Sequence, residues 1–191
     1  MKKWIALAFL GLVLAAPARA MVFTGSLLGT NENPPNASPG TGSVTVTMDL
    51  DLHTLRIESS FEGLLAGVTA AHIHCCTSDA TPNVSPATQT PSFVNFPLGV
   101  MAGSYDMTFD TSQASTWNAS FVTANGGTTA GAETAFFNGM MDGGAYFNIH
   151  SSLYPSGEIR ANLTPVPEPS TYALLLAGLV VVGGVATRRR R

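Results

Sequence analysis

The feature that most constrains this chain is an apolar segment at each end, with cationic residues beside it. Lys2 and Lys3 precede an apolar run that closes with the small residues Ala18 and Ala20. This arrangement is typical of a secretory signal peptide cleaved after Ala20. A buried helix or a retained anchor is the alternative, but the run is short for a membrane span. We therefore expect signal peptidase to remove residues 1–20.

The C-terminal segment, residues 165–191, has a different order of features. A proline-rich stretch at 166–171 is followed by uncharged apolar residues at 172–187 and by four arginines at 188–191. Arginines after an apolar span are a stop-transfer feature that stays on the cytoplasmic side. We expect residues 172–187 to form a transmembrane helix in the inner membrane. The span is shorter than the ~20 residues usually needed, which suits a temporary tether.

Residues 21–164 remain as a single domain with an unusual charge balance. They contain two arginines, Arg56 and Arg160, no lysine and eleven carboxylates, a formal charge of −9. Such a domain is repelled by phosphate backbones and anionic headgroups, so we expect no nucleic-acid partner. Its two cysteines, Cys75 and Cys76, are adjacent, so no disulfide framework holds the domain together.

The periodicity of this domain is that of β-strands. Residues 42–51 alternate apolar side chains with Ser, Thr and Asp, as a half-buried antiparallel strand does. Residues 55–61 fit as its hairpin partner, with His53 as a solvated residue in the turn. Further strands are expected at residues 22–28, 68–75, 103–109, 145–151 and 158–164.

One segment departs from this pattern and predicts a short helix. Residues 129–141 contain helix formers, with apolar side chains grouped at helical spacing, and Asp142-Gly143-Gly144 follows them. We therefore expect a mainly β domain, an antiparallel, Greek-key-like β-sandwich with one short helix. The signal peptide and the C-terminal transmembrane helix flank it.

A first polar segment is Ala71-His72-Ile73-His74-Cys75-Cys76. On a strand, His72 and His74 share one face, and Cys76 is a further candidate on that face.

A second polar segment combines Asn148 and His150 with Glu158 and Arg160. Asn148 and His150 share one strand face, and the turn at Pro155-Ser156-Gly157 would bring Glu158 and Arg160 onto the same sheet.

These two segments resemble the chordin-type (CHRD) domain family. That family has an A-H-I-H element early in the domain and an N-[IV]-H-[ST]…P-x-G-E-[IL]-R-G element at its end, and the similarity spans residues 22–164. Cys75 and Ala161 depart from it, because glycine is usual at both positions. The resemblance implies an extracellular β-sandwich module without enzymatic activity.

The tail is similar to PEP-CTERM sorting signals. Pro167, Glu168 and Pro169 precede the apolar span and the arginine cluster in the order that such signals have. The similarity implies that an exosortase cuts near this tripeptide, and that the protein is associated with exopolysaccharide or biofilm matrix.

The histidines leave two interpretations open. His72, His74 and His150, with Cys76 as a fourth candidate, could hold copper or zinc, as paired histidines on sandwich strands do. Alternatively, they form a structural polar cluster with Asn148, Glu158 and Arg160, in which Glu158 pairs with Arg160. We favour the structural interpretation, with no resident cofactor.

The cysteines are similarly open: a vicinal disulfide, pairing with another chain, and free thiols are all compatible with export.

The sequence thus predicts an exported, non-catalytic module that is tethered to the membrane and then placed on the cell surface or in the extracellular matrix. The alternative is a superoxide-dismutase-like redox enzyme or a copper-handling protein.

Overall fold

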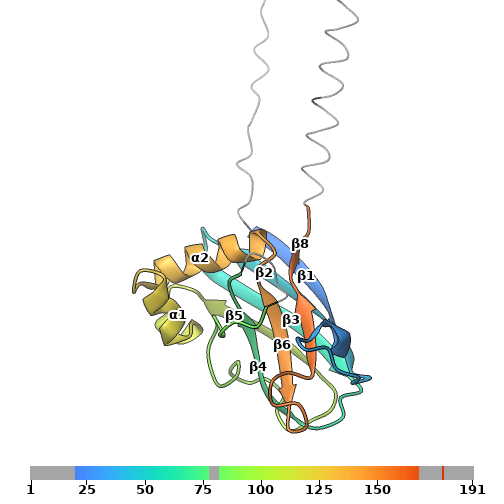
Figure 1. Cartoon of the computed structure of the whole chain (residues 1–191). Coiled ribbons are helices and arrows are strands. Elements are labelled where there is room, and N and C mark those ends of the chain that lie inside the picture. The colour runs from blue at the N-terminus through green and yellow to red at the C-terminus, as the bar shows by residue number, and fades with distance from the viewer. Residues whose placement is uncertain (1–19, 78–81, 168–177, 179–191) are drawn as a thin grey trace, which may run out of the picture.

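The computed structural model describes residues 20–77, 82–167 and 178, and its dominant feature is a single antiparallel sheet. The sheet curls around the core in the order β4-β6-β7-β1-β2-β3-β5, with β8 paired to β1 (Figure 1). The strands are β1 (Ala20–Leu28), β2 (Thr41–Asp49), β3 (Thr54–Glu62), β4 (Val68–His74), β5 (Gly103–Asp110), β6 (Tyr146–Ser151), β7 (Ile159–Asn162) and β8 (Thr164–Pro165).

This architecture agrees with the predicted antiparallel β-domain and is consistent with a β-sandwich, although its strands form one continuous sheet. The predicted strands are present with ends shifted by one or two residues, and the strand expected at 158–164 is divided into β7 and β8. The expected hairpin is formed by β2 and β3, which pair antiparallel with Val46 opposite Ile57.

The core lies on the concave side of the sheet and contains the residues that the alternation placed there. Val44, Val46 and Met48 of β2 are at most 1% exposed, while Thr45 and Thr47 between them are only partly buried. Fully buried side chains from the other strands include Phe23, Leu27, Leu55, Ile57, Ile73, Phe147, Ile149 and Ile159.

Helix α2 (Thr129–Met141) occupies the predicted residues and lies across one end of the curled sheet (Figure 1). Thr128 caps its N-terminus by accepting a hydrogen bond from the backbone N–H of Gly131. After the helix, Gly143 has a φ of +73°, a conformation that glycine adopts at low cost.

Three short helical segments were not predicted. The α-helix α1 (Ala119–Ala124) is capped by Asn118, and the 3₁₀-helices are η1 (Gly29–Asn31) and η2 (Ala114–Thr116).

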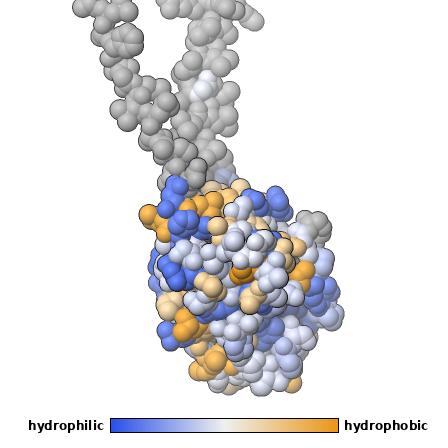
Figure 2. Space-filling view, turned by 90° about the vertical axis from the view of Figure 1, so that its left-hand side faces the viewer, coloured by the Kyte–Doolittle hydropathy of each residue, from blue (hydrophilic) through white to orange (hydrophobic). Residues whose placement is uncertain are grey.

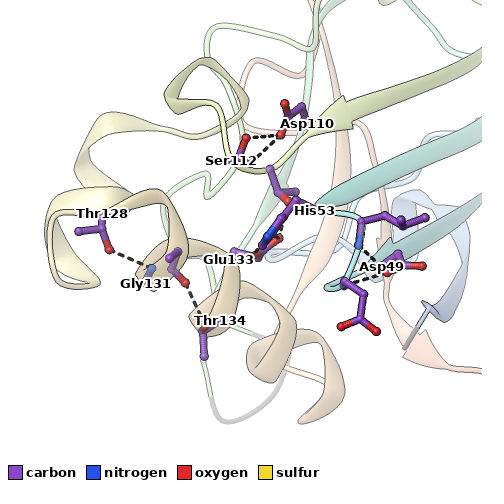
Figure 3. Close-up of polar contacts among 12 residues, drawn as sticks. Asp49, His53, Asp110, Ser112, Thr128, Gly131, Glu133 and Thr134 are labelled. Atoms are coloured by element: carbon purple, nitrogen blue, oxygen red, sulfur yellow. Dashed lines mark hydrogen bonds and ion pairs between the residues drawn. The ribbon is translucent and has the colours of Figure 1, made fainter. Parts of the chain in front are cut away.

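The β2–β3 turn is attached to α2 through His53, which is exposed in the turn, as predicted, and also has a partner on the helix. Its Nδ1 lies 3.0 Å from both carboxylate oxygens of Glu133, a residue of α2 (Figure 3). The Glu133 carboxylate is buried, and it also accepts a hydrogen bond from Thr111 Oγ1. His53 is half-exposed. The Glu133 carboxylate thus links the turn, through His53, and the segment after β5, through Thr111, to the helix.

The face of the domain shown in Figure 2 is mainly hydrophilic, with separate hydrophobic patches among the polar residues. Such a mixture is usual for a surface in contact with water. In the part of the chain that the structure describes, no helix has the length and apolar character needed to cross a membrane. Residues 1–19 of the predicted signal peptide, residues 168–171 of the sorting motif and all but residue 178 of the predicted transmembrane helix lie outside the described residues.

Candidate metal centre

The predicted histidines lie on two neighbouring strands, β4 and β6, which pair antiparallel with His72 opposite Asn148. Alternate residues of a strand share a face, so His72 and His74 point away from the core while Ile73 between them is fully buried in it. His150, two residues beyond Asn148, lies on the same outer face as His72.

This placement brings the three imidazole rings into one cluster. One ring nitrogen from each of His72, His74 and His150 lies within 4.8 Å of the others. His72 Nδ1 is 3.0 Å from His74 Nε2, and the ring centroids of His72 and His150 are 4.7 Å apart. The sequence predicted that these residues share a face, and the sheet register brings them together.

Backbone carbonyls determine the tautomers of two of the rings. His74 Nδ1 donates to the carbonyl of Val84, and His150 Nδ1 donates to the carbonyl of Pro155 at 2.9 Å. In the neutral form, each ring then has a lone pair on Nε2. His150 Nε2 is buried and has no hydrogen-bond partner among the described residues. Imidazoles that bind metals commonly donate their other N–H to a carbonyl in this way.

The electrostatic environment keeps the three rings neutral. Burial, together with charge repulsion by the neighbouring His150 and His74, lowers the pKa of His72 to about 3. Burial also lowers the pKa of His74, to about 4, against a raising effect of the hydrogen bond to Val84. The pKa of His150 is lowered for the same main reason. Unprotonated nitrogens are the form that can coordinate a metal ion.

A cation–aromatic stack lies beside the cluster. The Tyr146 ring stacks on His74 with centroids 4.6 Å apart, and the Arg160 guanidinium carbon lies 3.2 Å from the centroid of the Tyr146 ring. Arg160 is fully buried and donates to Asn83 Oδ1 at 2.9 Å and to the Pro82 carbonyl at 3.0 Å. Arginine over a tyrosine face is a favourable arrangement, strengthened by burial.

Asn148 lies between the histidines and a buried carboxylate. Its Nδ2 donates to Glu32 Oε1 at 2.6 Å. Burial raises the pKa of Glu32 to about 7, although the positive charge of Arg160 and the hydrogen bond from Asn148 both act to lower it. The connector that contains Glu32 has no periodicity, so the sequence did not point to this residue. Tyr146, by contrast, alternates with Asn148 and His150, and its face could have been deduced.

The predicted pair between Glu158 and Arg160 does not form. Glu158 Oε1 accepts hydrogen bonds from Ser38 Oγ at 2.7 Å and from the backbone N–H of Leu65 at 2.6 Å. The alternate-face rule failed here because β7 begins at Ile159, and Gly157, with a φ of +132°, redirects the chain just before Glu158.

The cysteines form a vicinal disulfide, one of the three states considered from the sequence. β4 ends at His74, so the alternation does not continue to Cys76, and the Cys76 sulfur lies against Gly139 of α2. The structure therefore places three of the four candidate ligands together and assigns Cys76 to a disulfide.

The same pair lines an open cleft of about 460 Å³ between α1, α2 and the end of β4.

Comparisons with known proteins agree with this structure. The CHRD domain model matches residues 23–163, and the PEP-CTERM protein-sorting motif matches residues 165–191. No curated protein and no solved structure matches the chain. Neither match is to an enzymatic family, and the sorting motif implies export and exosortase processing. Because the first match covers most of the sequence, this chain belongs to the CHRD domain family and carries a C-terminal PEP-CTERM sorting signal.

Proposed function

We propose that this protein is a non-catalytic CHRD module that is delivered to the cell surface or the extracellular matrix and binds one transition-metal ion there, copper or zinc, through His72, His74 and His150. The sorting signal supports the route: signal peptidase acts at the N-terminus, the C-terminal helix tethers the chain to the inner membrane, and an exosortase processes it. The formal charge of −9 on residues 21–164 favours a role among hydrated polymers such as exopolysaccharide.

The observation that carries the metal site is the convergence of three neutral imidazoles, with one ring nitrogen of each within 4.8 Å of the others. A purely structural cluster would pair all of these nitrogens, and the hydrogen bond between His72 Nδ1 and His74 Nε2, at 3.0 Å, does pair two of them. His150 Nε2, however, is buried without a partner among the described residues, and Asn148 contacts Glu32 in place of it. A buried acceptor without a donor costs about 1–3 kcal/mol, which a bound ion would recover.

A superoxide-dismutase-like redox activity is the second candidate, since copper bound to histidines can support it. The burial of the site favours holding a metal over turnover. His72 and His74 are only 7% and 8% exposed, so a substrate would have little access to an ion bound between them. Copper handling is therefore the closer alternative.

Metal analysis of the purified full-length protein tests this proposal. We expect about one equivalent of copper or zinc per chain, and loss of that metal in the variant His72→Ala, His150→Ala. His53→Ala is the matched control, because His53 is the remaining histidine of the chain and contacts Glu133 instead of the cluster. Equal metal content in all three proteins would refute the site.

A further inference from the structure

The donor set of the proposed metal site contains no negative charge. The three histidine side chains contact one another, two backbone carbonyls and the Tyr146 ring, and no described carboxylate reaches them. The buried carboxylate of Glu32 is bonded to Asn148. An ion bound by neutral imidazoles keeps its full charge inside the protein.

A fixed positive charge lies one aromatic ring away from the site. Arg160 lies over one face of Tyr146 at 3.2 Å, and Tyr146 stacks nearly parallel to His74, with an interplanar angle of 7°. The Arg160 guanidinium, the Tyr146 ring and the His74 ring therefore form one continuous stack that ends at the cluster. A cation bound between the histidines is therefore repelled by Arg160 in a region of low dielectric constant.

Both effects depend on the charge of the ion. Desolvation of a buried ion rises with the square of its charge, and repulsion by Arg160 rises linearly with it. Imidazole is a suitable ligand for both copper and zinc, and divalent copper binds nitrogen sites more tightly than zinc does. Of these ions, only copper also has a stable monovalent state.

From this arrangement, and resting on the proposed metal site, we infer that the resident ion is copper and that the site holds Cu(I) in preference to divalent ions. The site provides three nitrogens, which is a low coordination number that a monovalent ion accepts. Two of them are Nε2 of His74 and of His150, whose tautomers are fixed by backbone carbonyls. The third belongs to His72, whose ring contacts no backbone carbonyl among the described residues. The inferred role is the binding of monovalent copper at the cell exterior.

The test is a competition titration of the full-length protein with Cu(I) under anaerobic conditions, and separately with Cu(II) and Zn(II), against chromophoric chelators. We expect Cu(I) to bind at least about a hundredfold more tightly than Zn(II). In Arg160→Met, Zn(II) affinity should rise about tenfold relative to Cu(I), because a neighbouring positive charge is removed. Arg160→Lys, which retains the charge, is the matched control and should leave the ratio unchanged.

Glu32→Gln provides a second test if Arg160→Met fails to fold, because removing a carboxylate near Arg160 should lower Zn(II) affinity relative to Cu(I). Zinc binding as tight as Cu(I) binding in the unmodified protein overturns the Cu(I) inference and leaves the metal site standing. Binding of neither ion, or equal binding by His72→Ala, His150→Ala, overturns the proposed function itself.

Discussion

A single methyl group tests how α2 is placed against the sheet. Gly139 is a buried residue inside α2, and a Cβ added there would overlap the sulfurs of both Cys75 and Cys76 and lie 2.8 Å from Cys76 Cβ. A disulfide between adjacent residues has no flexible end that can move aside. Gly139→Ala therefore requires the helix, or the end of β4, to shift.

The size of the effect follows from two opposing terms. Alanine in place of glycine stabilises a helix interior by about 1 kcal/mol. Overpacking a close contact costs about 1–3 kcal/mol, and the rigidity of both sulfurs places this contact at the upper end. The net loss in the free energy of unfolding should be about 2 kcal/mol. At about 2–4 °C per kcal/mol for a domain of this size, the midpoint of thermal unfolding should fall by roughly 4–8 °C.

Thermal and urea unfolding of Gly139→Ala, measured with and without the additional changes Cys75→Ala and Cys76→Ala, provides the assay. Removing both sulfurs eliminates the two shortest contacts and leaves the 2.8 Å approach to the Cβ of residue 76, whose remaining cost is offset by the helix preference of alanine, so in that background Gly139→Ala should be close to neutral. A double-mutant cycle would then give a coupling of about 2 kcal/mol. An equal cost of Gly139→Ala in both backgrounds would show that the sulfurs do not limit the position of the helix, and the reasoning would be wrong.

The remaining predictions concern pH and sorting. Hydrogen bonding to Glu133 raises the pKa of His53. The stabilisation from this pair is therefore fully present below pH about 6.5 and disappears as pH rises through the raised pKa. His53→Gln should remove this pH dependence from thermal unfolding curves. The histidine cluster has the opposite pH dependence, because the pKa values of His72 and His74 are lowered: its contribution to stability is present above pH about 6.5 and is lost as pH falls towards 4 and 3. Bound metal should be released over the same range. Unfolding curves and metal retention after acid dialysis would check both expectations. Replacing residues 167–169 with alanines should leave the full-length chain in the membrane fraction on immunoblots, and release of a product of unchanged size would exclude exosortase processing at that motif.

The β-strands could be predicted because their information is local. Apolar and polar residues alternate along β2, and the predicted face is the face that is buried. The same local information located α2 within its observed bounds, since its apolar residues have helical spacing and glycines follow it. Alternation does not specify which strands pair, so the joining of all strands into one curled sheet appeared only in the structure.

The candidate site shows where local information ends. Alternation placed His72 and His74 on one face, but the rule cannot be extended past a strand end. The candidate ligand Cys76, which follows the end of β4, is in a disulfide, and the expected pair between Glu158 and Arg160 is absent. Glu32 reaches Asn148 from a segment more than a hundred residues away, which no local pattern could have indicated.

The sequence by itself determined the C-terminal sorting signal, the strand faces and the presence of His72 and His74 on a common face, because each of these depends on residues close together in the chain. Only the tertiary structure decided that His150 joins His72 and His74, that carbonyls orient two of the rings, and that Arg160 and Tyr146 stack beside them. Those features depend on strand register and on loops folding over the sheet, where contacts are made between residues that are distant in sequence.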